Sequence, residues 1–185
     1  MSNIALTKDA LRKQMKEAIS HLSDHEKIHE SEIMIRVIAK FIQSHPMIRT
    51  VASYAATHNE LNLDELPSLL PEVRFCYPKC ELQGIMKFHA VSNLLEMKLV
   101  TMGIREPSST LHPQLQPNEI DLFICPAYAY SEDGKRLGKG GGYYDRYLSK
   151  KRPDSLTLGV TFACQKVALG TIPTEPHDLL IDQIL

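Results

Sequence analysis

The chain has 185 residues, of which 43% are hydrophobic and 23% are charged, close to the average for globular proteins. This composition excludes a disordered tail, a fibrous repeat and a membrane-spanning protein. Lys and Arg total 21 against 22 Asp and Glu, a net charge of −1, so we expect no general attraction to nucleic acid or acidic lipid. We expect residues 1–185 to form a single domain.

The first quarter of the chain predicts two helices and a strand. Residues 7–22 carry apolar side chains at helical spacing, and residues 23–26 have the Ser-x-x-Glu pattern of a capping box that begins a second helix. The second helix should end at His45, because Pro46 disfavours helical geometry in the residue before it. Residues 49–56 are β-branched and apolar enough for a strand.

The middle of the chain predicts short elements. Asp64 could cap a short helix over residues 66–70. Residues 73–77 and 85–90 are typical of strands. Residues 105–119 are rich in Pro, Ser and polar groups, which predicts a loop.

The C-terminal third predicts the centre of the sheet. Residues 121–125 are a nearly unbroken apolar run, as in a strand buried on both faces. A helix over residues 143–150 follows, ended by Pro153, and residues 156–162 predict another buried strand. Strands alternating with helices indicate an α/β fold with a mostly parallel central sheet flanked by helices. In such folds ligands bind beyond the carboxyl ends of the strands.

The N-terminus and the cysteines bear on the compartment. Residues 1–8 do not combine a charged region with an apolar stretch, so they do not resemble a signal peptide, and we expect a cytoplasmic protein. Cys76, Cys80, Cys125 and Cys164 form no Cys-x-x-Cys pair, so we interpret them as free thiols, several of them in the core.

Glycine is concentrated in one segment. Five of the 9 glycines fall within nine residues, at positions 134, 138, 140, 141 and 142. Such a loop lets backbone amides approach an anion, and the amides that begin the following helix add its positive dipole end. Lys135, Arg136 and Lys139 contribute three cations. The segment therefore predicts a phosphate-binding loop.

The same segment admits other interpretations. The spacing fits neither a Walker A loop nor the G-x-G-x-x-G dinucleotide pattern. A hairpin with its bend at Asp133-Gly134 explains Gly134 but not the other four glycines. Asp145 either complements the helix dipole or binds Mg²⁺. Tyr143 and Tyr144 should point about 100° apart, so we expect only one to face a ligand.

Taken together, the motifs resemble those of the 5-formyltetrahydrofolate cyclo-ligase (5,10-methenyltetrahydrofolate synthetase) family. The hallmark is Arg136-Leu137-Gly138-x-Gly-x-Gly142-Tyr143-Tyr144-Asp145. Four further matches occur in the same order: Lys8 with Arg12; Glu60; Gly103-Ile104-Arg105-Glu106-Pro107; and Pro173, Glu175, His177, Asp178 and Asp182.

The resemblance implies a sugar-isomerase/CoA-transferase-like fold and an ATP-dependent ligase of folate one-carbon metabolism. Such an enzyme converts 5-formyltetrahydrofolate, which can carry a polyglutamate tail, to 5,10-methenyltetrahydrofolate and releases ADP and phosphate. In the family's reaction the formyl oxygen is phosphorylated, N10 attacks the resulting imidoyl phosphate, and phosphate leaves. The resemblance implies ATP and Mg²⁺ as cofactors. The balanced charge and the lack of a long apolar run lead us to expect neither nucleic acid nor a membrane as a partner.

The resemblance also implies roles for individual residues. Catalysis would fall to Lys139 and Arg136. ATP would be bound by Lys8, Arg12, Arg136, Leu137, Gly138, Lys139, Gly140, Gly141, Gly142, Tyr143 and Tyr144. The folate would be bound by Ala55, Glu60, Lys139, Gly140, Gly141, Gly142 and Tyr143. Mg²⁺ would be held by Asp145 and Asp178.

Three alternatives remain beside the ligase. A catalytically silent folate- or nucleotide-binding protein is disfavoured by the intact set of Arg136, Lys139, Asp145 and Asp178, because a pure folate binder would not need metal ligands. A nucleic-acid-binding module is disfavoured by the balanced charge and by the lack of a basic stripe beyond the loop. An enzyme of the same fold could act on a different formamide or amide.

Overall fold

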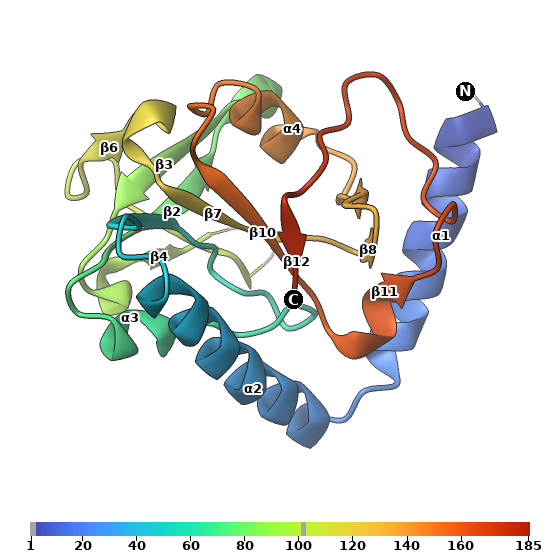
Figure 1. Ribbon diagram of the computed structural model, residues 1–185, viewed down its shortest axis with the longest axis horizontal. Coiled ribbons are helices and arrows are strands. Elements are labelled where there is room, and N and C mark those ends of the chain that lie inside the picture. Colours follow the sequence, from blue (N-terminus) through green and yellow to red (C-terminus); the bar gives the residue numbers. More distant parts are fainter. Residues whose placement is uncertain (1–2, 101–102) are drawn as a thin grey trace.

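The computed structural model describes residues 3–100 and 103–185 and is built around a seven-stranded sheet (Figure 1). The strand order is β12-β10-β7-β1-β2-β3-β6. The strands from β12 to β2 run parallel, whereas β3 and β6 join antiparallel. The predicted α/β fold with a mostly parallel sheet flanked by helices is confirmed. Met1 and Ser2 lie outside the described residues. They belong to the N-terminal segment 1–8 on which the expectation of a cytoplasmic protein rests.

The bounds of the elements are as follows. The α-helices are α1 (Asn3–Ser20), α2 (Asp24–Gln43), α3 (Leu66–Leu69) and α4 (Tyr143–Leu148). The strands of the large sheet are β1 (Thr50–Ala52), β2 (Arg74–Cys80), β3 (Met86–Ala90), β6 (Gln114–Leu115), β7 (Leu122–Pro126), β10 (Leu156–Val160) and β12 (Gln183–Ile184). The other strands are β4 (Lys98–Leu99), β5 (Arg105–Glu106), β8 (Ala129–Ser131), β9 (Arg136–Leu137) and β11 (Lys166–Val167).

The sheet separates two apolar cores. Successive residues of β7 alternate between them: Leu122 and Ile124 face the core covered by α2, and Phe123 and Cys125 face the core covered by α4. This alternation follows from the two-residue repeat of a strand. All four side chains are buried, so the prediction of a strand buried on both faces is confirmed.

The first helix packs outside the large sheet. In Figure 1, α1 stands beside β11, and its Leu11 and Met15 pack on Ala129 and Leu137 of the small sheet β11-β8-β9. This arrangement brings the N-terminal turns of α1 close to the segment after β9. Each of the described helices is too short or too polar to cross a membrane.

The N-terminus of α2 follows the capping pattern of its local sequence, whereas that of α3 does not. The capping box of Ser23 and Glu26 is present at the start of α2, as predicted. The prediction that Asp64 caps the short helix α3 is wrong, because Glu65 takes that position without a side-chain hydrogen bond. The Asp64 carboxylate instead accepts two hydrogen bonds from Nη2 of Arg105, at 2.8 and 2.7 Å.

Several predicted boundaries also differ from the structure. β1 covers only three residues of the predicted 49–56, because the chain then leaves the sheet and Tyr54 and Ala55 turn toward a cavity. The expected loop over residues 105–119 contains β5, β6 and a 3₁₀ turn at Pro117–Glu119. The four cysteines are free, and two of them, Cys76 and Cys125, are buried.

Asp121 ties together the beginnings of two central strands. Its carboxylate accepts hydrogen bonds from the backbone N–H groups of Arg49 and Thr50, at 2.8 and 2.7 Å, and pairs with Arg152. Partial burial opposes ionisation, but the bonds from Arg152 and the two N–H groups outweigh it and lower the pKa of Asp121 below 3.8.

Replacing Asp121 by Asn should lower the free energy of unfolding at pH 7 by about 2 kcal/mol, because charge-assisted hydrogen bonds are lost. A carboxylate whose pKa is lower in the folded state stabilises the fold at pH values above its unfolded-state pKa. This stabilisation is lost as the pH falls through the folded-state pKa. Urea unfolding of both proteins should therefore give a difference that shrinks below pH 3.8. Asp154→Asn is the control, since Asp154 also contacts Arg152 but is 77% exposed. A difference independent of pH would contradict this role.

Candidate active site

A cavity of about 750 Å³ lies at the carboxyl ends of β1, β2 and β7, under the segment that follows β9. This is the edge at which ligands bind to parallel sheets. Every residue that the sequence proposes for ATP, folate or Mg²⁺ lines it. They are Lys8, Arg12, Ala55, Glu60, Arg136, Leu137, Gly138, Lys139, Gly140, Gly141, Gly142, Tyr143, Tyr144, Asp145 and Asp178.

The glycine-rich segment consists of a hairpin followed by a loop. β8 and β9 pair antiparallel, and Gly134 in their turn has φ +81° and donates its N–H to the Ser131 carbonyl. The hairpin interpretation is therefore correct for Gly134, while the other four glycines lie in the loop that lines the cavity. Lys135 belongs to the turn, where it pairs with Asp133 at 2.7 Å.

The loop glycines make room for neighbouring side chains. Gly142, the N-cap of α4, has φ +63°, and a Cβ there would lie 2.6 Å from Nη1 of Arg146. A Cβ on Gly141 would lie 2.7 Å from the Tyr143 ring. Arg146 in turn donates to the carbonyls of Gly84 and Gly141. A side chain at either position would therefore displace a neighbouring side chain, and at Gly142 it would also have to adopt a left-handed backbone conformation.

Gly142→Ala should lower the rate of the reaction that the resemblance implies, formation of 5,10-methenyltetrahydrofolate, at least tenfold. Arg146 must leave the Gly141 carbonyl and the loop must shift. The positive φ alone should lower the free energy of unfolding by about 1–2 kcal/mol. Gly170→Ala is a matched control, since Gly170 has φ +80° but nothing lies within 4 Å of its would-be Cβ. Equal stability losses with activity lost only in Gly142→Ala would support this role, and full activity in Gly142→Ala would contradict it.

Arg136 lies beneath the loop and is almost completely buried. Its Nη2 donates to Asp145 at 2.9 Å, and its Nη1 reaches the Pro126 carbonyl at 3.5 Å. Burial opposes its charge, but nearby Tyr130 and Asp145 outweigh it and raise the pKa of Arg136. Its Nε is buried without a hydrogen-bond partner in the described chain.

Lys8 joins α1 to the C-terminal segment. Its ammonium contacts Asp178 at 2.6 Å and Glu175 at 2.9 Å, and the residue is only 7% exposed. Lys8 is therefore a buried ion-pair residue and not a surface lysine. Burial opposes its charge, but the bonds to Asp178 and Glu175 prevail and raise the pKa of Lys8. The Lys8 bond likewise lowers the pKa of Asp178 against the effect of burial. One turn further along α1, Arg12 donates to the Gly138 carbonyl at 2.9 Å.

Lys139 crosses the cavity to Glu60. The two charged groups are 2.8 Å apart, and the Glu60 side chain is only 9% exposed. The other Glu60 oxygen accepts hydrogen bonds from N–H and Oγ1 of Thr57, at 2.9 and 2.7 Å. Glu60 is therefore a fixed wall residue and not an ordinary exposed loop acid.

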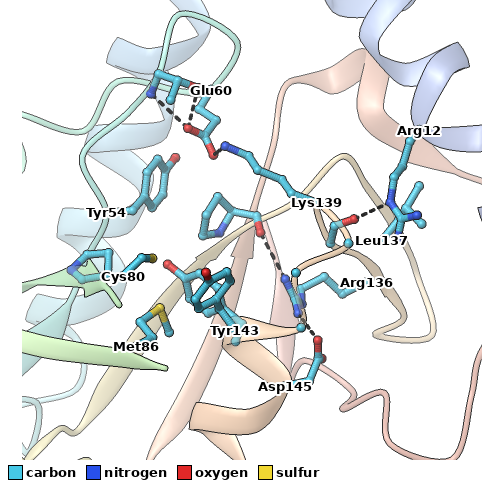
Figure 2. A pocket seen from close by; sticks show the side chains of 18 of the residues that line it. Arg12, Tyr54, Glu60, Cys80, Met86, Arg136, Leu137, Lys139, Tyr143 and Asp145 are labelled. Atoms are coloured by element: carbon cyan, nitrogen blue, oxygen red, sulfur yellow. Dashed lines mark hydrogen bonds and ion pairs between the residues drawn. The ribbon is translucent and has the colours of Figure 1, made fainter. Parts of the chain in front are cut away.

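The cavity has a charged side and an apolar side. Figure 2 shows Arg12, Arg136 and Asp145 opposite Cys80 and Met86, with Lys139 spanning the space toward Glu60. The apolar side was not predicted from the sequence. It also includes Tyr54, Pro78 and Ile104.

The two adjacent tyrosines both line the cavity, so the expectation that only one would face it is wrong. Arg146 lies 5.7 Å from the Tyr143 ring centre, and Arg136 lies 5.3 Å from that of Tyr144. Burial raises the pKa of Tyr144 well above its usual value, and its hydroxyl has no hydrogen-bond partner in the described chain.

The candidate Mg²⁺ ligands approach the cavity from two elements. Asp145 comes from the first turn of α4, and Asp178 from the segment before β12. Ligand atoms of Glu175, His177 and Asp178 lie within 4.8 Å of one another. Carboxylate oxygens are the ligands that Mg²⁺ takes in proteins, so Asp145, Glu175 and Asp178 are of a suitable type, but Asp145 does not belong to this close group. Glu175, His177, Ile104, Arg105 and Glu106 had been noted in the sequence only as motif matches, without a role.

The fold and the cavity define a class of protein. A mostly parallel sheet carries, at its carboxyl edge, a glycine-rich loop with buried cations, acids suited to a metal ion and an adjoining apolar wall. This combination is typical of α/β enzymes that act on an anionic ligand.

Comparison with known proteins identifies the family. The model of the 5-formyltetrahydrofolate cyclo-ligase family matches residues 5–185. The 5-formyltetrahydrofolate cyclo-ligase of Mycoplasma pneumoniae is 29% identical over 180 residues, covering 97% of this chain and 98% of that protein. Its Mycoplasma genitalium counterpart is 29% identical over 181 residues, covering 96% of each. The chain belongs to the 5-formyltetrahydrofolate cyclo-ligase family, as its motifs indicated.

Solved structures agree with this assignment. The 5,10-methenyltetrahydrofolate synthetase of Mycoplasma pneumoniae has a TM-score of 0.79 at 28% identity and covers 96% of each chain. The NMR structure of the Aquifex aeolicus 5,10-methenyltetrahydrofolate synthetase has a TM-score of 0.81, also at 28% identity. It covers 96% of this chain and 88% of that chain.

Proposed function

We propose that this protein converts 5-formyltetrahydrofolate to 5,10-methenyltetrahydrofolate in a reaction that uses ATP and Mg²⁺ and releases ADP and phosphate. Family membership supports the reaction. The observation that carries the proposal for this chain is the cavity itself, in which a charged side and an apolar side adjoin with Lys139 between them.

The two sides suit two different reactants. The loop from Gly138 to Gly142, with Lys8, Arg12 and Arg136 around it, suits the phosphates of ATP. The apolar wall with Met86, together with the fixed carboxylate of Glu60, suits a planar heterocycle bearing N–H donors. Binding both in one cavity brings the formyl oxygen to the phosphoryl group in a productive orientation.

The protein's contribution to the chemistry is positioning and charge. An amide oxygen is a poor leaving group until it is phosphorylated, so the site must stabilise negative charge on the phosphoryl group in transfer. Lys139 and Arg136 supply positive charge there. The Arg136 Nε and the Tyr144 hydroxyl are buried without partners behind the cavity lining, so each would donate to a bound ligand only after a small shift of the wall.

Asp145 and Asp178 would hold Mg²⁺, which when bound supplies further neutralisation of phosphate charge. Both side chains already bind cations of the protein, Asp145 through Arg136 and Asp178 through Lys8. The oxygens so engaged are Oδ2 of Asp145 and Oδ2 of Asp178, which leaves Oδ1 of each carboxylate for Mg²⁺.

The decisive experiment mixes the protein with 5-formyltetrahydrofolate, ATP and Mg²⁺ and records the near-ultraviolet absorbance of the methenyl product. We expect the absorbance to rise only when all three are present, with ADP and phosphate formed in equal amounts. A protein that binds ATP but gives no product would favour a silent binding protein and reject the proposed function.

A further inference from the structure

The Lys139–Glu60 ion pair differs from the other ion pairs of the site. Arg136 pairs with Asp145, and Lys8 pairs with Asp178 and Glu175. All of these residues lie in the charged part of the cavity. Lys139 is instead held by an acid that faces the proposed folate. Figure 2 shows its side chain extended across the cavity from the loop to Glu60.

The two partners differ in mobility. Both oxygens of the Glu60 carboxylate are engaged: Thr57 donates twice to Oε2, and Lys139 lies 2.8 Å from Oε1. The Lys139 side chain is 48% exposed, against 9% for Glu60. The acid is therefore fixed and the lysine can turn, so any change of partner must come from movement of Lys139.

An incoming folate must compete for the same oxygen. Thr57 already supplies Oε2 with two donors, so N–H groups of a folate ring reach Glu60 most readily at Oε1. The ammonium of Lys139 stands there in the free protein. Once displaced, that ammonium is free to turn, and the phosphates of ATP are its best charge match among the proposed ligands.

We propose that Glu60 is a positioning residue for Lys139: it holds the ammonium away from ATP until the folate substrate binds Glu60 and releases it. This inference rests on the proposed function and adds a sequence of events to it, in which folate binding precedes the contact of Lys139 with ATP. Without folate, the terminal phosphate of ATP lacks the Lys139 charge, so transfer to water is suppressed. Because coupling between two binding sites is reciprocal, ATP must tighten folate binding by the same factor.

The test measures the affinity of a non-hydrolysable ATP analogue with Mg²⁺ by calorimetry, with and without 5-formyltetrahydrofolate. The wild-type protein should bind the analogue about tenfold tighter when the folate is present. Glu60→Gln keeps the side-chain shape but removes the charge. It should bind the analogue about tenfold tighter than the wild type in the absence of folate, because Lys139 is already free. Lys139→Met should show no effect of folate.

Glu81→Gln is the matched control. It breaks the Lys87–Glu81 ion pair, also 2.8 Å long, whose residues are not among those lining the cavity. It should behave as the wild type. If Glu60→Gln binds the analogue no tighter than the wild type without folate, the positioning role is overturned, even if the wild type forms the methenyl product. A wild type that forms no product and binds no analogue would overturn the proposed function as well.

Discussion

Replacing Lys139 by alanine should lower the rate of methenyl product formation by about two to three orders of magnitude while the fold persists. The Lys139 side chain extends from the loop across the cavity, and its ammonium contacts Glu60. This cation can therefore reach both sides of the cavity. Removing it takes positive charge from the phosphoryl group in the transition state. Affinity for the ATP analogue without folate should change little, because the ammonium is held by Glu60 in the free protein.

The measurement is a steady-state assay of product absorbance together with thermal unfolding. Lys135→Ala is the control, since Lys135 belongs to the same glycine-rich segment but pairs with Asp133 in the hairpin turn. It should retain more than half of the wild-type rate. If Lys139→Ala keeps a rate within threefold of the wild type, the role of Lys139 in phosphoryl transfer must be abandoned.

Local patterns predicted the elements whose stability is decided by near neighbours. The start of α2 follows from the reciprocal bonds of Ser23 and Glu26, three residues apart. The central strand β7 was readable because both of its faces are buried, which requires an apolar run. The loop that lines the cavity was found because small residues and cations are concentrated after that strand.

Contacts between distant segments were not readable in the same way. Lys8 and Asp178 are 170 positions apart, and nothing local to either shows that they pair. Asp64 has the right residue type for a helix cap, but its carboxylate instead accepts hydrogen bonds from Arg105, 41 positions away. Pairing of charges depends on the folded arrangement, so composition alone could suggest binding residues but not their partners.

The apolar side of the cavity shows the same limit. Cys80 and Met86 lie opposite each other where β2 and β3 pair. The hairpin joins the sheet beside β1, and this brings both residues to the ligand-binding edge. Neither carries a motif, and both would serve equally well in a core. The rule that ligands bind at the carboxyl ends of parallel strands is the signal that could have located Cys80, which ends β2.

Arg136→Met should lower the free energy of unfolding by about 3 kcal/mol and abolish detectable product formation. The Arg136 and Asp145 side chains are 5% and 16% exposed, so removing the guanidinium leaves a largely buried carboxylate without its cation. The same change removes the contact of Arg136 with the Tyr144 ring and a positive charge from the cavity lining. Urea unfolding and the absorbance assay measure the two losses separately.

The double variant Arg136→Met, Asp145→Leu separates the structural from the functional loss. Replacing both members of a buried ion pair by apolar residues is often close to neutral, whereas removing one is costly. Most of the lost stability should therefore return in the double variant. Activity should not return, because a cation for the phosphates and a proposed Mg²⁺ ligand are both missing. If the double variant stays as unstable as Arg136→Met, the unpaired Asp145 carboxylate is not the cause of the instability. If it regains activity, neither residue takes part in the reaction.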